Sequence, residues 1–336
     1  MLITKIYKSS EFNEAAKELR LGELVAFPTE TVYGLGADAT NEQAVKRVYL
    51  AKGRPSDNPL IVTVSSLEMV KRFVPSLSKE VEKIIEKFWP GSLTIVLKIK
   101  DGSLSKTVTG GLRTAAFRMP KNETTLNLIT ALGNPIVGPS ANSSGKPSPT
   151  TAQHVYHDLE GRIAGILDDG PTDVGVESTI IDMSTEIPTI LRPGAVTAEE
   201  IEKVIGKEVY SDKHKVKENE IPKAPGMKYK HYAPSAQVLI VNKDNWNSAL
   251  QWANENKNQV GILADDEVLS KALENKTYSL GENVESAAKN LFAGLRYFDD
   301  DNQIKYILAE AFPEEGVGLA YMNRLKKSAG NQFYNK

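Results

Sequence analysis

Two cations follow a helix-like stretch in the segment KGRPSDNPL, residues 52–60. A lysine at a helix C-terminus is favourable with the helix dipole, which explains Lys52 without any ligand. The dipole does not explain Arg54, which precedes a proline and a polar run that includes Asn58. Because an arginine fork matches two phosphate oxygens and a lysine acts as a point charge, the pair also fits an anion site. Spacing alone leaves both interpretations open.

A second polar loop, GPSANSSGKPSPTT at residues 138–151, joins an expected strand to an expected helix. It contains Gly-Lys but does not match a P-loop, because Ser140 stands where the motif needs glycine and Pro147 where it needs Ser or Thr. Hydroxyls, backbone N–H groups and a helix N-terminus can still bind an anion. A turn that caps the next helix explains the same residues, so both interpretations stay open.

The loop PTETVYGLGADAT, residues 28–40, carries two closely spaced glycines. A dinucleotide-binding fingerprint needs a strand that turns straight into a helix at the glycines, and here they come well after the strand-like VAF. A glycine-bearing connecting loop is the simplest interpretation. A polar ligand contact through Thr29, Thr31 and Tyr33 is the alternative.

Three more arginines, Arg113, Arg118 and Arg192, lie near the ends of strand-like stretches. Residues at strand ends commonly meet ligands. With Lys52 and Arg54 they form a set of loop cations in a chain whose formal net charge is −2. The set predicts a concave site for a polyphosphate and a small polar partner.

The sequence shows no nucleophilic or metal-binding machinery, and we predict no metal site built by the protein. His154 and His157 have a spacing that suits a metal on an expected helix, but no third ligand accompanies them, and surface positions are favoured. Asp168 and Asp169 fit a turn, with a Mg²⁺ contact as the alternative. Cysteine is absent, which excludes disulfides, thiolate nucleophiles and iron–sulfur clusters.

Length, charge and hydrophobicity limit the classes of protein to which this sequence can belong. The 336 residues suggest two domains, and Lys+Arg 41 against Asp+Glu 43 argues against a dedicated nucleic-acid binder. The N-terminus lacks the apolar core of a signal peptide, and no uncharged apolar run approaches the roughly 20 residues of a membrane span. We expect a cytoplasmic protein with no membrane partner.

The polar loops need regular elements to position them. Val- and Ile-rich stretches alternate with amphipathic helices through residues 1–206, and the later strands follow one another without helices, which predicts an α/β domain with a mixed sheet. Residues 207–236, rich in Lys and Pro, have the composition of a linker. Residues 237–336 alternate strand and helix patterns, which predicts a small Rossmann-like βαβ domain with a parallel sheet.

The motifs PTETVYGLG, KGR, FRMP, SAN, STIID and LRPGAV, in this order, resemble the YrdC-domain family. The linker sequence KHYAP and the C-terminal α/β domain resemble the long, two-domain threonylcarbamoyl-adenylate synthases of that family. The resemblance implies a twisted mixed sheet with flanking helices around a concave site. It also implies that the linker acts as a lid.

That family makes threonylcarbamoyl-AMP and pyrophosphate from L-threonine, bicarbonate and ATP. The resemblance implies the same nucleotidyltransferase activity here, with Mg²⁺ held mainly by the phosphates of ATP. It implies that a downstream threonylcarbamoyl transferase machinery takes the product to form t6A at position 37 of tRNA. The chain would then meet tRNA only indirectly.

The resemblance also implies roles for particular residues. Lys52 and Arg54 would be catalytic. L-Threonine contacts are expected at Thr31, Thr63, Arg118, Ser140 and Ser178. ATP contacts are expected at Arg54, Asn58, Thr114, Asn142, Thr150, Arg192, His231 and Tyr232, the last two as part of the lid.

Two other functions were weighed. An RNA-binding module acting on tRNA or rRNA would use the same Arg and Lys residues, but the net charge and the lack of aromatic stacking motifs disfavour it. A carbamoyltransferase of the hydrogenase-maturation kind shares the YrdC domain. Such proteins add Cys-rich zinc fingers, which a chain without cysteine cannot form.

Overall fold

The computed structural model describes residues 2–56, 58–211, 222–223, 232–256, 258–272 and 274–335. Residue contacts divide the chain into two compact units. The first comprises Met1–Ser144, Pro149–Thr172 and Glu177–Lys228, and the second comprises Gly145–Ser148, Asp173–Val176 and Tyr229–Lys336. Among the described residues, no helix has the length and apolar character needed to span a bilayer.

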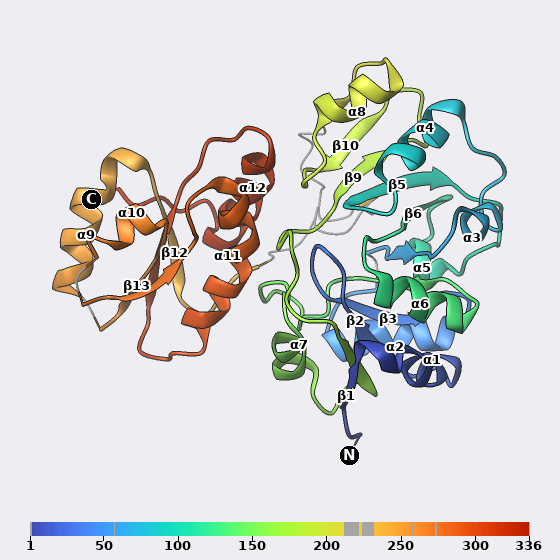
Figure 1. Ribbon diagram of the computed structural model, residues 1–336, viewed down its shortest axis with the longest axis horizontal. Coiled ribbons are helices and arrows are strands. Elements are labelled where there is room, and N and C mark those ends of the chain that lie inside the picture. The colour runs from blue at the N-terminus through green and yellow to red at the C-terminus, as the bar shows by residue number, and fades with distance from the viewer. Residues whose placement is uncertain are drawn as a thin grey trace. The chain divides into compact units, whose positions relative to one another are not determined.

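The first unit contains one large mixed sheet, in the order β1-β8-β2-β3-β7-β4-β6-β5-β9-β10-β11 (Figure 1). Parallel pairs such as β4 with β6 and β5 with β9 alternate with antiparallel pairs such as β5 with β6. The predicted mixed α/β sheet is therefore confirmed. The strands are β1 (Lys5–Lys8), β2 (Val25–Phe27), β3 (Gly34–Asp38), β4 (Ile61–Thr63), β5 (Leu93–Lys98), β6 (Thr114–Arg118), β7 (Ile136–Val137), β8 (Gly165–Asp168), β9 (Thr179–Asp182), β10 (Thr189–Arg192) and β11 (Tyr210–Ser211).

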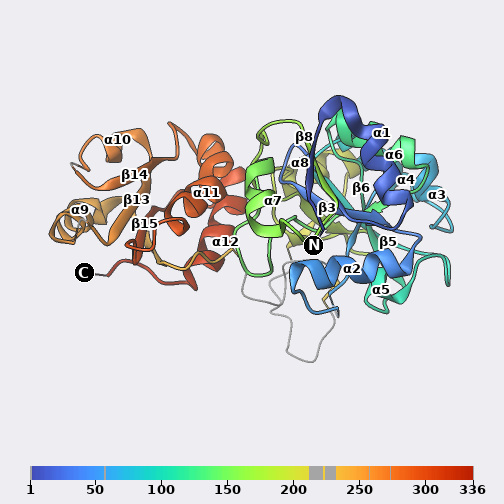
Figure 2. The same ribbon diagram turned by 90° about the horizontal axis from the view of Figure 1, so that it is seen from below.

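Helices cover this sheet because successive strand residues face opposite sides. Val25 and Phe27 pack with α1 and α6, which lie side by side in Figures 1 and 2, whereas Ala26 belongs to the core that includes α2, α4, α7 and α8. Side-chain oxygens of Asn41, Ser78, Asn122, Thr151 and Thr197 cap five of the helices. The helices are α1 (Phe12–Arg20), α2 (Glu42–Lys52), α3 (Leu67–Lys71), α4 (Lys79–Phe88), α5 (Lys106–Thr109), α6 (Glu123–Leu132), α7 (Ala152–Leu159) and α8 (Ala198–Ile205), with a 3₁₀ turn at Ser9–Glu11.

The second unit has a four-stranded parallel sheet, which confirms the predicted small α/β domain. Its order is β12-β15-β13-β14, and Figures 1 and 2 show α9 on one side with α11 and α12 on the other. The elements are β12 (Gln237–Val241), a 3₁₀ turn (Lys243–Asn245), α9 (Trp246–Glu255), β13 (Val260–Ala264), α10 (Asp266–Leu269), β14 (Lys276–Ser279), α11 (Val284–Asp299), β15 (Tyr306–Glu310) and α12 (Val317–Ala329).

Short segments from earlier in the sequence group with the second unit. The Arg296 guanidinium donates to the Pro147 carbonyl at 2.6 Å, and Lys146 Nζ lies 2.6 Å from Asp299 Oδ2. Burial acts to raise the pKa of Asp299, but hydrogen bonds from Lys146 and Ser235 outweigh burial and lower it. The boundaries 1–206, 207–236 and 237–336 stay a prediction from composition.

Glu310, at the end of β15, is an acid with an unusual environment. It is 7% exposed, and burial raises the pKa of its carboxyl to about 7 from the usual 4.5. A hydrogen bond of 2.7 Å from the Asp265 N–H opposes this shift without cancelling it. Because the folded pKa exceeds the unfolded one, Glu310 contributes stability below pH 4.5 that is lost as the pH rises through about 7.

Replacing this acid by its amide should remove that pH dependence. Glu310→Gln keeps an oxygen for the Asp265 N–H but carries no charge, so at about pH 8 its free energy of unfolding should exceed that of the wild type by about 1–3 kcal/mol. Near pH 4 the two proteins should be equally stable. Urea denaturation at both pH values measures the difference, with the exposed Glu285→Gln as control. A difference that does not change with pH would contradict the prediction.

Candidate active site

The carboxyl ends of β4 and β6 bring two predicted site residues together. In the parallel ladder Thr63 is the register partner of Arg118. Both side chains lie on the sheet face opposite Val62 and Phe117, which belong to the hydrophobic core. Thr63 is 3% and Arg118 is 7% exposed, so a hydroxyl and a guanidinium sit side by side largely out of water.

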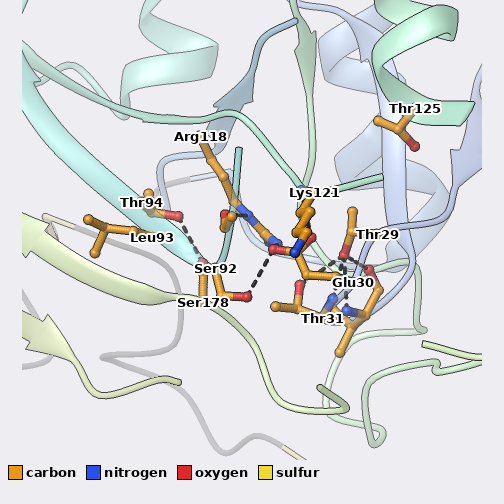
Figure 3. A network of polar contacts seen from close by, with 12 residues as sticks. Thr29, Glu30, Thr31, Ser92, Leu93, Thr94, Arg118, Lys121, Thr125 and Ser178 are labelled. Atoms are coloured by element: carbon orange, nitrogen blue, oxygen red, sulfur yellow. Dashed lines mark hydrogen bonds and ion pairs between the residues drawn. The ribbon is translucent and has the colours of Figure 1, made fainter. Parts of the chain in front are cut away.

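Arg118 is held by Glu30, from the loop between β2 and β3 (Figure 3). Arg118 Nη2 lies 2.7 Å from Glu30 Oε1, and Arg118 Nε donates to the Gly91 carbonyl at 3.3 Å. A charge taken out of water is tolerated only when it is paired and hydrogen-bonded. The ion pair therefore lets Arg118 remain buried at the end of its strand.

A small cavity of about 20 Å³ borders this pair. Its lining includes Arg118, Thr63 and Ser140, which are three of the residues expected to contact L-threonine. Gly138 is required beside it, because a Cβ there would lie 2.6 Å from Thr63 Oγ1 and 2.9 Å from the ring of Phe27. The rest of the lining is Phe27, Thr29, Val32, Gly34, Ile61, Pro120 and Gly138.

Lys52 lies at the C-terminal end of α2, where Gly53 adopts a left-handed conformation (φ 62°) that ends the helix. Its side chain is buried, and its ammonium donates to the Ser140 carbonyl and, at 2.6 Å, to the Asn142 carbonyl. Ser140 Oγ donates to Asn142 Oδ1 at 2.6 Å. Lys52 thus joins the helix end to the Ser-x-Asn loop, two motifs that the sequence analysis treated separately.

Arg54 and Asn58 follow this helix end. Arg54 Nη2 lies 3.4 Å from the carbonyl oxygens of Asn58 and Pro59. The Asn58 side chain is fully buried, and neither its Nδ2 nor its Oδ1 has a hydrogen-bond partner among the described residues. An unsatisfied buried amide costs about 1–3 kcal/mol, so a structure that retains one is consistent with a ligand that completes it.

Arg192 and Ser178 are joined across the ends of β10 and β9. Arg192 donates to the Ser178 carbonyl through Nε at 3.1 Å and Nη2 at 2.9 Å, and its Nη2 also reaches Ser178 Oγ at 3.2 Å. Ser178 Oγ lies 2.8 Å from Thr94 Oγ1, as Figure 3 shows. Arg192 is 5% exposed, so a third cation is buried beside hydroxyls.

The Thr-containing loop before β3 is fixed by its own hydroxyls. Thr29 Oγ1 accepts from the N–H groups of Thr31 and Val32 and lies 2.8 Å from Thr31 Oγ1. Gly34 bridges to Ser140, which brings this loop to the Ser-x-Asn loop. Thr31 is therefore a buried hydroxyl beside the cavity loops, as a ligand-contact interpretation requires.

The remaining predicted residues are spread over other segments of the chain. Thr114 begins β6, so it lies about 13 Å along the strand from Arg118. Thr150 is buried, with its hydroxyl 3.4 Å from His154 Nδ1. Tyr232 lies in the second unit with a positive φ of 65°, and its ring centroid is 5.1 Å from that of Phe292. His231 lies outside the described residues, so its expected ATP contact stays a prediction.

His157 lies at the surface, and Asp168 and Asp169 form hydrogen bonds at the end of β8. His157 is 68% exposed beside Asp158. Asp168 Oδ1 accepts from the Gly170 N–H at 3.0 Å, and Asp169 Oδ2 accepts from Asn122 and Thr124. Across the part of the chain that the structure describes, no three His, Asp or Glu side chains form a metal-binding group.

Glu30 is the site residue that the sequence analysis missed. It stands between Thr29 and Thr31 in a motif already singled out, but its partner Arg118 is 88 positions away. The available signal was chemical: a site with several buried cations needs an acid as counter-ion. Glu30 is an acid directly flanked by the candidate ligand residues Thr29 and Thr31.

Two family models match this chain. The family model Sua5/YciO/YrdC, described as "Telomere recombination", matches residues 17–194. A second model, described as "Threonylcarbamoyl-AMP synthase, C-terminal domain", matches residues 196–330. The fold and these models place the chain in the class of YrdC-type α/β enzymes that carry a second domain.

Relatives that match most of the chain identify the family within this class of enzymes. The threonylcarbamoyl-AMP synthase of Bacillus subtilis (strain 168) is 48% identical over 323 residues, which is 95% of this chain and 93% of that protein. The enzyme of that name from Pyrococcus abyssi is 46% identical over 322 residues, 94% of this chain and 93% of that protein. The crystal structure of P. abyssi Sua5 complexed with L-threonine has a TM-score of 0.90 at 43% identity and covers 99% of each chain. The chain belongs to the threonylcarbamoyl-AMP synthase family.

The contacts of Lys52 lead to a stability prediction. Lys52→Met removes the donor from two buried carbonyl oxygens, so the free energy of unfolding should fall by about 1–3 kcal/mol. Lys46→Met, on the same helix, removes only an exposed pair with Glu42 and should change stability by less than about 0.5 kcal/mol. Urea denaturation of both variants measures the difference. Equal stabilities would show that the Lys52 ammonium does not hold the loop.

Proposed function

We propose that this chain joins L-threonine, bicarbonate and ATP into threonylcarbamoyl-AMP with release of pyrophosphate. Membership of the threonylcarbamoyl-AMP synthase family supports the reaction, and ATP and L-threonine follow as its substrates. The structural observation that supports the proposal is the Thr63–Arg118 pair at the strand ends, beside a cavity lined by Ser140. A guanidinium with hydroxyls on either side fits an amino acid carboxylate.

In this reaction the threonine amine forms a bond to the bicarbonate carbon, water leaves, and an N-carboxylate results. An oxygen of the N-carboxylate then attacks the α-phosphorus of ATP, the bond to the β-phosphate oxygen breaks, and pyrophosphate departs. Such a transfer depends on positioning and on cations placed where negative charge develops. We assign the amino acid to Thr31, Thr63, Arg118, Ser140 and Ser178.

We assign the nucleotide to the cations and amides on the neighbouring loops. Lys52 and Arg54 stabilise charge during transfer, and the unsatisfied Asn58 amide gains its partners from the ligand. The remaining ATP contacts in this proposal are Thr114, Asn142, Thr150, Arg192, His231 and Tyr232.

Mg²⁺ belongs to the proposal as an ion bound by the nucleotide. Apart from Glu30, whose carboxylate pairs with Arg118, the side chains of this proposed site are cations, hydroxyls and amides, which suits a metal held by phosphates and water rather than by protein carboxylates. When bound, the ion shields the phosphate charge. Transfer of the product to a threonylcarbamoyl transferase machinery that modifies tRNA, and location in the cytoplasm, stay predictions.

The activity is tested by pyrophosphate release. Purified protein should release pyrophosphate only when ATP, L-threonine and bicarbonate are all present, and without RNA. Pyrophosphate release that does not require L-threonine and bicarbonate would contradict the proposal, and so would salt-sensitive tRNA binding without turnover. Either result would favour the RNA-binding alternative.

A single substitution tests the phosphate-side cations. Arg54→Ala should lower turnover about 100-fold or more, because an electrostatic contact in the transition state is lost, while the fold remains intact. Arg47→Ala is the matched control, because Arg47 lies on α2, the helix before Arg54, and among the described residues bonds only to the Gly22 carbonyl and Glu23. Turnover of the Arg54 variant at the wild-type rate would remove Arg54 from the site.

A further inference from the structure

Glu30 is a buried carboxylate whose partners define the orientation of Arg118. It is 8% exposed, and both of its oxygens are engaged. Oε1 lies 2.7 Å from Arg118 Nη2 and accepts from Ser92 Oγ at 2.9 Å, and Oε2 accepts from the Lys121 N–H at 3.1 Å. Figure 3 shows the carboxylate between these donors, which come from two segments of the chain that are separate from Glu30. The carboxylate therefore has one fixed position.

The hydrogen bonds of Arg118 leave one edge of its guanidinium available. A guanidinium has five N–H donors in a rigid plane. Nε donates to the Gly91 carbonyl, and one Nη2 hydrogen meets Glu30. The other Nη2 hydrogen and the Nη1 hydrogens have no hydrogen-bond partner among the described residues, and Arg118 lines the small cavity with Thr63 and Ser140. That remaining edge has the geometry that binds a carboxylate through two parallel hydrogen bonds.

A long arginine side chain has many rotamers, and the bonds to Gly91 and Glu30 select the one in which Arg118 lines the cavity. Gly91 and Glu30 hold the guanidinium at two of its three nitrogens. The edge that remains available is therefore already ordered before a ligand binds. Glu30 also neutralises Arg118 while the cavity holds no anion, which lowers the cost of keeping a cation buried.

We propose that Glu30 is a positioning residue that orients Arg118 toward the α-carboxylate of the amino acid and makes the site selective for a free carboxylate. The inference rests on the proposed function, in which Arg118 contacts L-threonine. Glu30 itself touches neither the reacting atoms nor ATP in this account. It acts through the guanidinium that it holds.

The test compares two ligands that differ only at the carboxyl group. Binding of L-threonine and of L-threoninamide is measured by titration calorimetry for the wild type and for Glu30→Gln, and the ratio of the two affinities is the readout. The amide variant cannot pair with the guanidinium charge, so the preference for L-threonine should fall by about tenfold or more, while L-threoninamide affinity changes much less. A merely structural role would weaken both ligands equally. An unchanged ratio would overturn the proposal.

Asp182→Asn is the matched control. Asp182 is also a buried carboxylate of the first unit, 2% exposed, but it bonds to Lys223 and Ser184 and not to Arg118. The same change from acid to amide there should leave the ratio as in the wild type. If the ratio fell equally in this control, loss of any buried acid would explain the effect and the proposal would fail.

Arg118→Gln separates the inference from the function on which it rests. Loss of the carboxylate preference in Arg118→Gln but not in Glu30→Gln would reject the positioning role alone. Retention of the preference in Arg118→Gln would reject the assignment of Arg118 to L-threonine. If circular dichroism shows that Glu30→Gln is unfolded, Glu30→Asp carries the test, because the shortened acid draws the guanidinium aside and should lower the ratio about threefold or more. An unchanged ratio in that variant would equally overturn the proposal.

Discussion

Arg118 is buried at the end of β6, so its positive charge has to be balanced there by a negative charge. Its position follows from β6, which ends beside β4 with Thr63 as the register partner. Glu30 supplies the opposite charge, and Ser92 and the Lys121 N–H hold that carboxylate in turn. Three segments that share no local sequence relation therefore have to converge on one ion pair. This convergence leaves guanidinium donors at the edge of a cavity, where the proposed function puts the carboxylate of L-threonine.

The other cations obey the same constraint with different partners. Lys52 is satisfied by carbonyl oxygens of the Ser-x-Asn loop, and Arg192 by the carbonyl and hydroxyl of Ser178. None of the three is exposed enough for water to screen its charge. Neutral oxygens hold Lys52 and Arg192, so these two cations keep their attraction for phosphate or carboxylate, whereas Arg118 is paired with the charge of Glu30. A cluster of this kind suits a transfer in which the substrates bring the negative charge and the protein brings none of the nucleophiles.

The strand and helix patterns of the sequence predicted the fold class, and most of the predicted site residues followed from the resemblance of its motifs to a known family. It could not predict which strands are neighbours, since β4 pairs with β6 and β7 rather than with the next strand along the chain. The pairing of Glu30 with Arg118 and the carbonyl partners of Lys52 depend on that topology. The grouping of Gly145–Ser148 with the second unit has no signature in composition either. Thr114 begins β6 and Arg118 ends it, so two predicted site residues lie at opposite ends of one strand.

The central claim is that Arg118 and the loop cations divide the substrates between them. A crystal structure of the protein with L-threonine and a non-hydrolysable ATP analogue tests this most directly. The account predicts the threonine carboxylate on the Nη1 and Nη2 atoms of Arg118, with Glu30 still paired to it, and the phosphates against Lys52, Arg54 and Arg192. A carboxylate bound away from Arg118, or phosphates that occupy the Thr63 cavity instead, would contradict it.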